Sequence, residues 1–199
     1  MRFLPRRGRW AIGCGRRVSR FLFLFTAFFF SAGYSQNINL CSACHGPDGN
    51  STSAGVPSIA GQPKLFIETQ LVLFREGIRG SDQMRAAVRG LKDPEIVRLA
   101  EHFSRLRAQA APGNVDIAIF NRGEALARKN RCGICHVADF RGQNQVPRLA
   151  GQREEYLLAE MRAYRDNKRR GGDTIMAAAL YGVADGDIGA LAHFLARSR

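Results

Sequence analysis

The pattern Cys-x-x-Cys-His occurs twice in this chain of 199 residues, and it limits the possible folds more than any other feature. Three landmarks recur in one order at offsets of 90 to 92: this pattern, a Pro-x-x-Ala-Gly-Gln sequence and a Met-x-Ala-Ala sequence. The matched pairs are Cys41 to His45 with Cys132 to His136, Pro57 to Gln62 with Pro147 to Gln152, and Met84 with Met176. Such a regular recurrence indicates a tandem duplication.

Helical periodicity repeats together with the landmarks. Apolar residues recur three or four positions apart, which predicts amphipathic helices. The matched faces are Ile67, Leu71 and Phe74 with Leu157, Met161 and Tyr164, and Ile96, Leu99, Ala100 and Phe103 with Ile188, Leu191, Ala192 and Leu195. Asp93 is expected to be the N-cap of its helix, with Pro94 at the first helical position. Because strand signals are poor throughout, we expect an all-α fold.

Residues 1–35 are typical of a signal peptide. Seven arginines and no acidic residue precede an apolar run from Phe21 to Phe30, and small residues follow. That order predicts a cleaved secretory signal with the cut after Ser35, and hence a periplasmic protein. An uncleaved N-terminal anchor, which would tie the protein to the membrane, is the alternative. Cys14 lies inside this segment.

The rest of the chain is expected to form two domains. Residues 36–110 would form the N-terminal domain, 111–114 a linker, and 115–199 the C-terminal domain, because Ala110 to Asn114 interrupts the helical pattern. A helix is predicted from about Val115 to Lys129, before the second cysteine pair. Only a few residues precede Cys41 after the expected cut, so the first half has no room for a counterpart.

Much of the positive charge belongs to the predicted signal. The chain has 30 basic and 17 acidic residues, a net charge of +13; without the seven signal arginines it has 23 and 17, a net charge of +6. This excess favours an acidic partner through long-range attraction and does not require nucleic acid. The run Lys168 to Arg170 is interpreted as a solvated loop.

Cys-x-x-Cys-His is the attachment signature of haem c. Residues at i and i+3 face one side of a helical turn, so Cys41 with Cys44, or Cys132 with Cys135, can bind the two vinyl groups of a porphyrin. His45 and His136 would then ligate the two irons. Structural zinc, a thioredoxin-like redox pair and disulfides are competing interpretations, but the spacing and the missing βαβ pattern disfavour them.

A second axial ligand is expected from Met84 and Met176, one in each half. Each follows a glycine-containing break, and a loop there would present the thioether to the far face of the haem. Met161 lies on a predicted apolar helix face and is interpreted as core packing. His102 and His193, in the last helices of the two halves, are interpreted as rim residues.

These motifs resemble the dihaem cytochrome c4 family of the class I c-type cytochromes, over essentially the whole chain after the signal. The resemblance implies two tandem all-α domains, each wrapped around one covalent haem with His/Met ligation. It also implies that the carbonyls of Pro57 and Pro147 accept hydrogen bonds from the ligand histidines and orient them. The dihaem cytochrome subunit of flavocytochrome c sulfide dehydrogenase is similar over the same span.

Two departures from the family pattern stand out. The first half lacks the N-terminal helix that the family packs against its last helix. The second half has Val137 to Phe140 where the first has a glycine-rich loop, Gly46 to Gly49. The two haem environments are therefore expected to differ.

The function expected from these features is electron transfer rather than catalysis. A His/Met-ligated haem has no open site for a substrate, and the soft thioether raises its reduction potential. Expected partners are redox proteins, some of them membrane-bound: a donor cytochrome or dehydrogenase, and a terminal oxidase as acceptor. An electron-accepting subunit of a dehydrogenase complex is one alternative, and an enzyme or sensor with a displaced methionine is another.

Overall fold

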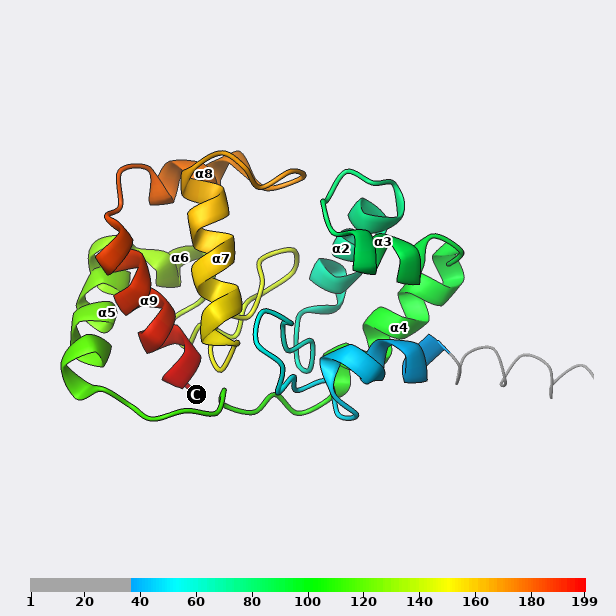
Figure 1. Cartoon of the computed structure of the whole chain (residues 1–199), viewed down its shortest axis with the longest axis horizontal. Coiled ribbons are helices and arrows are strands. Elements are labelled where there is room, and N and C mark those ends of the chain that lie inside the picture. The colour runs from blue at the N-terminus through cyan, green and yellow to red at the C-terminus, as the bar shows by residue number, and fades with distance from the viewer. Residues whose placement is uncertain (1–36) are drawn as a thin grey trace, which may run out of the picture. The chain divides into compact units, whose positions relative to one another are not determined.

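A computed structural model describes residues 37–199 (Figure 1); residues 1–36, with the predicted signal peptide and Cys14, lie outside the described residues. The labelled helices are α2 (Lys64–Arg75), α3 (Asp82–Val88), α4 (Asp93–Arg105), α5 (Ile117–Lys129), α6 (Cys132–Cys135), α7 (Glu154–Arg165), α8 (Thr174–Leu180) and α9 (Asp185–Arg197). A helical segment at 37–45 precedes them. Residues 37–199 contain no β-strand, only one isolated bridge. The predicted all-α fold is confirmed.

The N-terminal half has its own hydrophobic core, built where α2 packs against α4. The predicted faces meet there, and their buried residues are Ile67, Leu71, Phe74, Ile96, Leu99, Ala100 and Phe103. Burying one large apolar side chain stabilises a fold by about 1.5–3 kcal/mol, so these faces account for much of this half's stability.

Helix α4 begins one residue earlier than predicted. Lys92 is its N-cap, Asp93 is its first residue, and Pro94 follows inside the first turn. The Glu95 carboxylate accepts a hydrogen bond from the backbone N–H of Lys92 at 2.9 Å, so a side chain within the helix gives the N-cap N–H its partner. Asp93 therefore acts through its charge near the positive end of the helix rather than as the cap.

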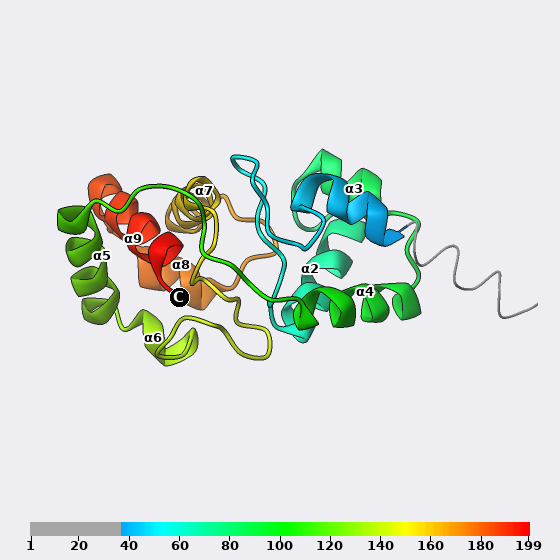
Figure 2. The ribbon, with the colours of Figure 1, turned by 90° about the horizontal axis from the view of Figure 1, so that it is seen from below.

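The C-terminal half is organised around the crossing of α5 and α9 (Figures 1 and 2). Helix α5 starts at Ile117, two residues after the predicted start, because the Asp116 side chain caps it by accepting from the N–H of Ile119 at 3.0 Å. Gly123 lies at the crossing, where a Cβ would be 2.0 Å from the carbonyl oxygen of Ala190. The second core also contains Ala111, from the predicted linker, and Met161, which packs there as predicted.

The helical segment at 37–45 carries the first Cys-x-x-Cys-His pattern, as α6 and its C-cap His136 carry the second. Ile38 and Cys41 from this segment pack against the N-terminal core. The Asn37 side-chain amide donates to Glu95 Oε1 at 3.2 Å, which links the segment to α4. One continuous helical stretch thus holds the first cysteine pair, whereas in the second half Arg131, at φ 55°, separates α5 from α6.

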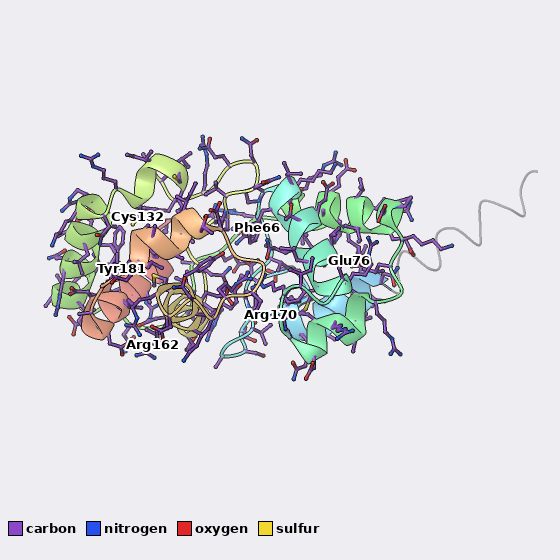
Figure 3. The ribbon with its side chains drawn as sticks, turned by 90° about the horizontal axis from the view of Figure 1, so that it is seen from above. Phe66, Glu76, Cys132, Arg162, Arg170 and Tyr181 are labelled. Carbon is purple, nitrogen blue, oxygen red and sulfur yellow. The ribbon has the colours of Figure 1, made fainter. Side chains whose placement is uncertain are left out.

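The basic run at 168–170 is only partly solvated, contrary to the prediction. Lys168 and Arg170 are exposed (Arg170 is labelled in Figure 3), but the Arg169 side chain is only 8% exposed. Arg169 forms an ion pair with Glu160 at 2.5 Å and donates to Gln70 of the N-terminal half at 3.2 Å. The Arg169 guanidinium thus has partly buried partners in both halves, and a run of charges in a sequence does not reveal such partners.

Within 37–199, no single helix is long and apolar enough to cross a membrane; α8 and α9 pass by length and composition only as a pair bent by 115°.

Candidate functional site

The four cysteines of the repeated pattern lie one helical turn apart in each pair and are free thiols. Cys44 and Cys135 are exposed, whereas Cys41 and Cys132 are half-buried against their cores. Burial raises the pKa of Cys41 to about 11 and also raises that of Cys132. Each pair thus presents two unpaired thiols from one turn of helix, the arrangement that attachment to a porphyrin requires.

The histidine after each pair is buried and held by a proline carbonyl. His45 Nδ1 lies 2.8 Å from the Pro57 oxygen, and His136 Nδ1 lies 2.8 Å from the Pro147 oxygen. Because a carbonyl can only accept, Nδ1 carries the proton in both rings. Burial lowers the pKa of both histidines, so the rings are neutral and Nε2 keeps a lone pair. Among the described residues Nε2 has no hydrogen-bond partner, so it is available to a metal.

The loop after each histidine places the proline by the same backbone hydrogen bonds. The carbonyl of Gly49 accepts from the N–H groups of Ile59 and Ala60, at 2.8 and 3.0 Å. The carbonyl of Phe140 accepts from Leu149 and Ala150 at 2.8 and 3.1 Å in the second half. The two halves therefore reach one geometry from two loop sequences.

The second loop reaches that geometry with backbone strain. Val137 and Phe140 adopt φ values of 59° and 55°, where the first half has Gly46 and Gly49 at 88° and 75°. A left-handed conformation costs a non-glycine residue roughly 1–2 kcal/mol. Phe140 packs edge-to-face against Phe194, with ring centroids 5.5 Å apart, and this contact offsets part of that cost.

The two candidate methionine ligands lie on short helices and not in loops as predicted. Met84 is the third residue of the seven-residue helix α3, and Met176 is the third residue of the seven-residue helix α8. Ser81 caps α3 by accepting from the N–H of Met84, and Asp173 caps α8 by accepting from the N–H of Ile175. The loop prediction was therefore wrong. A short capped helix that follows a glycine also lets the thioether pack against the core, so a loop is not needed for this.

Residues expected around a haem are partly buried and pack against the core of each half. In the N-terminal half these residues include Cys41, Ile59 and Met84. In the C-terminal half they include Cys132, Leu149 and Met176, the equivalent three positions (Cys132 is labelled in Figure 3). A thiol, an apolar side chain and a soft thioether packed against each core fit the chemistry of an attached haem.

His193 does not take part in this arrangement. His193, predicted at the rim, is instead buried in α9; its Nε2 accepts from the Asp116 N–H at 3.1 Å and its Nδ1 lies 3.3 Å from Glu154 Oε1. These contacts use both ring nitrogens, so His193 ties the start of α5 to α7 and α9. No cluster of three or more His, Cys, Asp or Glu suited to a metal ion occurs in the described part of the chain.

Two glutamines that the sequence analysis did not single out join the two halves. Gln152 bonds to the backbone of Ser58, and Gln62 bonds to the backbone of Arg148. Both glutamines are only 4% exposed. Each glutamine ends a copy of the repeated Pro-x-x-Ala-Gly-Gln sequence. This recurrence is a signal in the sequence that the two amides have equivalent hydrogen-bond partners.

Comparison with known proteins agrees with this geometry. A family model described as "Cytochrome c" matches residues 120–198. A cytochrome c4 from Thiocapsa roseopersicina is 30% identical over 175 residues, covering 82% of this chain and 90% of the relative. The cytochrome subunit of sulfide dehydrogenase from Chlorobaculum tepidum is 44% identical over 66 residues, 33% of this chain and 59% of that protein. The crystal structure of reduced cytochrome c4 from Pseudomonas stutzeri superposes with a TM-score of 0.77 at 28% identity, covering 85% of this chain and 98% of that one.

A helical fold with a Cys-x-x-Cys-His helix at the edge of each of two cores defines a c-type cytochrome. The chain belongs to the cytochrome c4 family. It is a dihaem protein with two class I cytochrome c domains in tandem, each built around one covalently attached haem, and it transfers electrons between redox partners.

Proposed function

We propose that each half holds its haem through the residues that the duplication repeats. Cys41, Cys44, His45 and Met84 serve the N-terminal haem; Cys132, Cys135, His136 and Met176 serve the C-terminal haem. The observation that carries this assignment is the matched histidine, buried and bonded at 2.8 Å to a proline carbonyl in both halves. The domains would be residues 36–110 and 115–199, joined at 111–114, after removal of residues 1–35 on export to the periplasm.

Bound haem supplies one-electron chemistry at its iron. The protein's own residues determine how that chemistry is used. The hydrogen bonds to Pro57 and Pro147 fix the ring orientation of the histidines and increase the basicity of Nε2. The thioethers of Met84 and Met176 would serve as soft ligands to the iron; they would favour its reduced state and leave no free site for a substrate. The residues thus support an electron carrier rather than an enzyme.

The proposed route is from a periplasmic or membrane-bound donor, a cytochrome or a dehydrogenase, toward a terminal oxidase, with no role for nucleic acid. The net charge of +6 beyond the signal would attract an acidic patch on a partner over distances of about 10 Å at moderate salt. The likeness to cytochrome c4 proteins over most of the chain supports a freely diffusing carrier.

The test is oxidation of the reduced dihaem protein by native membranes that contain a terminal oxidase, followed by haem absorbance. We expect rapid, oxygen-dependent oxidation whose rate falls several-fold between low and high salt. An oxidase inhibitor should abolish it. Membranes that leave the protein fully reduced in the presence of oxygen would contradict the proposed route.

An electron-accepting subunit of a dehydrogenase complex is the second candidate. The observation that favours it is the 44% identity over 66 residues to the Chlorobaculum tepidum cytochrome subunit of sulfide dehydrogenase. Purification of the native protein at low salt distinguishes the two candidates. A stable stoichiometric complex with a flavin- or quinone-containing protein would support the subunit, and a protein that elutes alone at 22 kDa or less would support the carrier.

A further inference from the structure

The junction between the two halves contains a reciprocal pair of side-chain bridges. Gln152 Oε1 accepts from the Ser58 N–H at 2.7 Å, and its Nε2 donates to the Ser58 carbonyl at 2.8 Å. Gln62 Oε1 accepts from the Arg148 N–H at 2.9 Å, and its Nε2 donates to the Arg148 carbonyl at 2.9 Å. The four residues are related by the duplication, so each half bridges to the other in the same way.

These bridges end on the peptide groups that hold the histidines. The N–H of Ser58 belongs to the same peptide group as the carbonyl of Pro57, which accepts from His45. A hydrogen-bonded chain therefore runs from His45 through one peptide group to Gln152 in the other half. The equivalent chain runs from His136 through the peptide group of Pro147 and Arg148 to Gln62.

A peptide group passes polarisation from one end to the other. When the N–H of a peptide group donates a hydrogen bond, electron density shifts toward the carbonyl oxygen of the same group, and this oxygen becomes a stronger acceptor. A stronger acceptor for the Nδ1 proton of a histidine makes its imidazole a more basic ligand. A more basic ligand stabilises the oxidised metal more than the reduced metal, so the reduction potential falls.

We infer that Gln152 and Gln62 are positioning residues that act across the junction: each lowers the reduction potential of the haem held by the opposite half. This inference rests on the proposed ligand roles of His45 and His136. The junction between the two halves would then help to set the two reduction potentials, because loosening the junction would raise the potentials of both haems.

The test uses the full dihaem protein with Gln152→Met or Gln62→Met, which keep the side-chain length and remove the amide. Haem potentials are measured by redox titration followed by NMR, with the resonances of each haem assigned. We expect Gln152→Met to raise the potential of the N-terminal haem and leave the other unchanged. Gln62→Met should raise that of the C-terminal haem. The Nδ1–H signal of the affected histidine in the reduced protein should move upfield in the same crossed pattern.

Gln70→Met is the matched control. Gln70 Oε1 accepts from Arg79 at 2.7 Å and from Arg169 of the other half at 3.2 Å, so this change also removes an amide from the junction. It touches neither proline peptide group, and no crossed shift is expected. Because the two test variants are made separately, failure of one to fold leaves the other as a complete test.

Three results would overturn the inference: no change in either potential, a change confined to the haem of the mutated half, or equal shifts in both haems from all three variants. The last would mean general loosening of the junction. A wild-type protein without histidine-ligated haems would instead overturn the proposed ligands themselves, so the two failures are distinguishable.

Discussion

His45 and His136 are held by backbone carbonyls, so their orientation depends on loop geometry more than on neighbouring side chains. The first loop achieves this geometry with glycines, the second with Val137 and Phe140 in left-handed conformations. The two loops thus differ in sequence and backbone conformation, yet the distance from histidine Nδ1 to the proline oxygen is 2.8 Å in both halves. This difference between the loops supports the expectation that the two haem environments differ.

Replacing Met84 or Met176 by alanine should change one haem at a time. Each variant is expected to lose the methionine–iron charge-transfer band of one oxidised haem and to lower that haem's potential, because the soft ligand is gone. The reduced variant should also bind carbon monoxide at the opened position. Absorbance spectra with and without carbon monoxide measure these effects.

Met161→Leu is the control for these variants. Met161 is 8% exposed in the C-terminal core, and a Leu of similar volume should cost less than about 1.5 kcal/mol of stability. Both charge-transfer bands should remain. A Met84→Ala protein that retains the full spectrum of the wild type would show that Met84 is not a ligand.

Among the elements, α5 and α9 cross in close contact, and Gly123 makes this approach possible. An added Cβ would lie 2.0 Å from the Ala190 oxygen and 2.6 Å from the Phe194 Cβ. Gly123→Ala should therefore lower the free energy of unfolding by about 1–3 kcal/mol, as overpacking does. Denaturant unfolding of the dihaem protein measures this change.

Gly189→Ala, in α9, is the matched control. Outside the adjoining residues and backbone of α9 itself, no atom lies within 4 Å of a Cβ built there, so the variant should gain about 0.5–1 kcal/mol from reduced chain flexibility. The two Gly→Ala changes are expected to have opposite signs. Equal effects would contradict the close packing of α5 on α9.

The start of α9 should make stability depend on pH. Hydrogen bonds from Arg162, first of all, and from Arg165 lower the pKa of Asp185 below 3.8. A lowered carboxylate pKa gives stability that is present above the unfolded pKa and is lost as the pH falls through the folded value.

Asp185→Asn is therefore expected to lower the melting temperature slightly at pH 7, and the difference from the wild type should shrink as the pH falls below about 4. Melting curves across this range measure it. A difference that stays constant down to the lowest pH would show that the Asp185 charge is not responsible.

At the scale of the whole molecule, the duplicated sequence predicted the fold and its buried helix faces. Periodicity is a local signal, so the sequence is sufficient to assign Ile67 and Leu99 to buried helix faces without knowledge of the helices that pack against them. The cysteine and histidine positions followed from one short motif. The comparisons confirm the family, the all-α fold and the dihaem class.

Features that depend on distant contacts were not predictable in the same way. Helices α3 and α8 have seven residues each, which is too few to show a helical period, so the sequence does not reveal that Met84 and Met176 lie on helices. The burial of Arg169 and the bridges of Gln62 and Gln152 depend on the meeting of two halves about 90 positions apart in the chain.

We expect each half to attach its own haem through its own cysteine pair. Intact mass spectrometry of protein matured in a haem-attaching host counts the attached haems. We predict two added haems for the wild type and one for each of two variants, C41S/C44S and C132S/C135S, with the remaining haem on the unaltered half. A wild-type mass with fewer than two haems, or a double variant that keeps both, would contradict it.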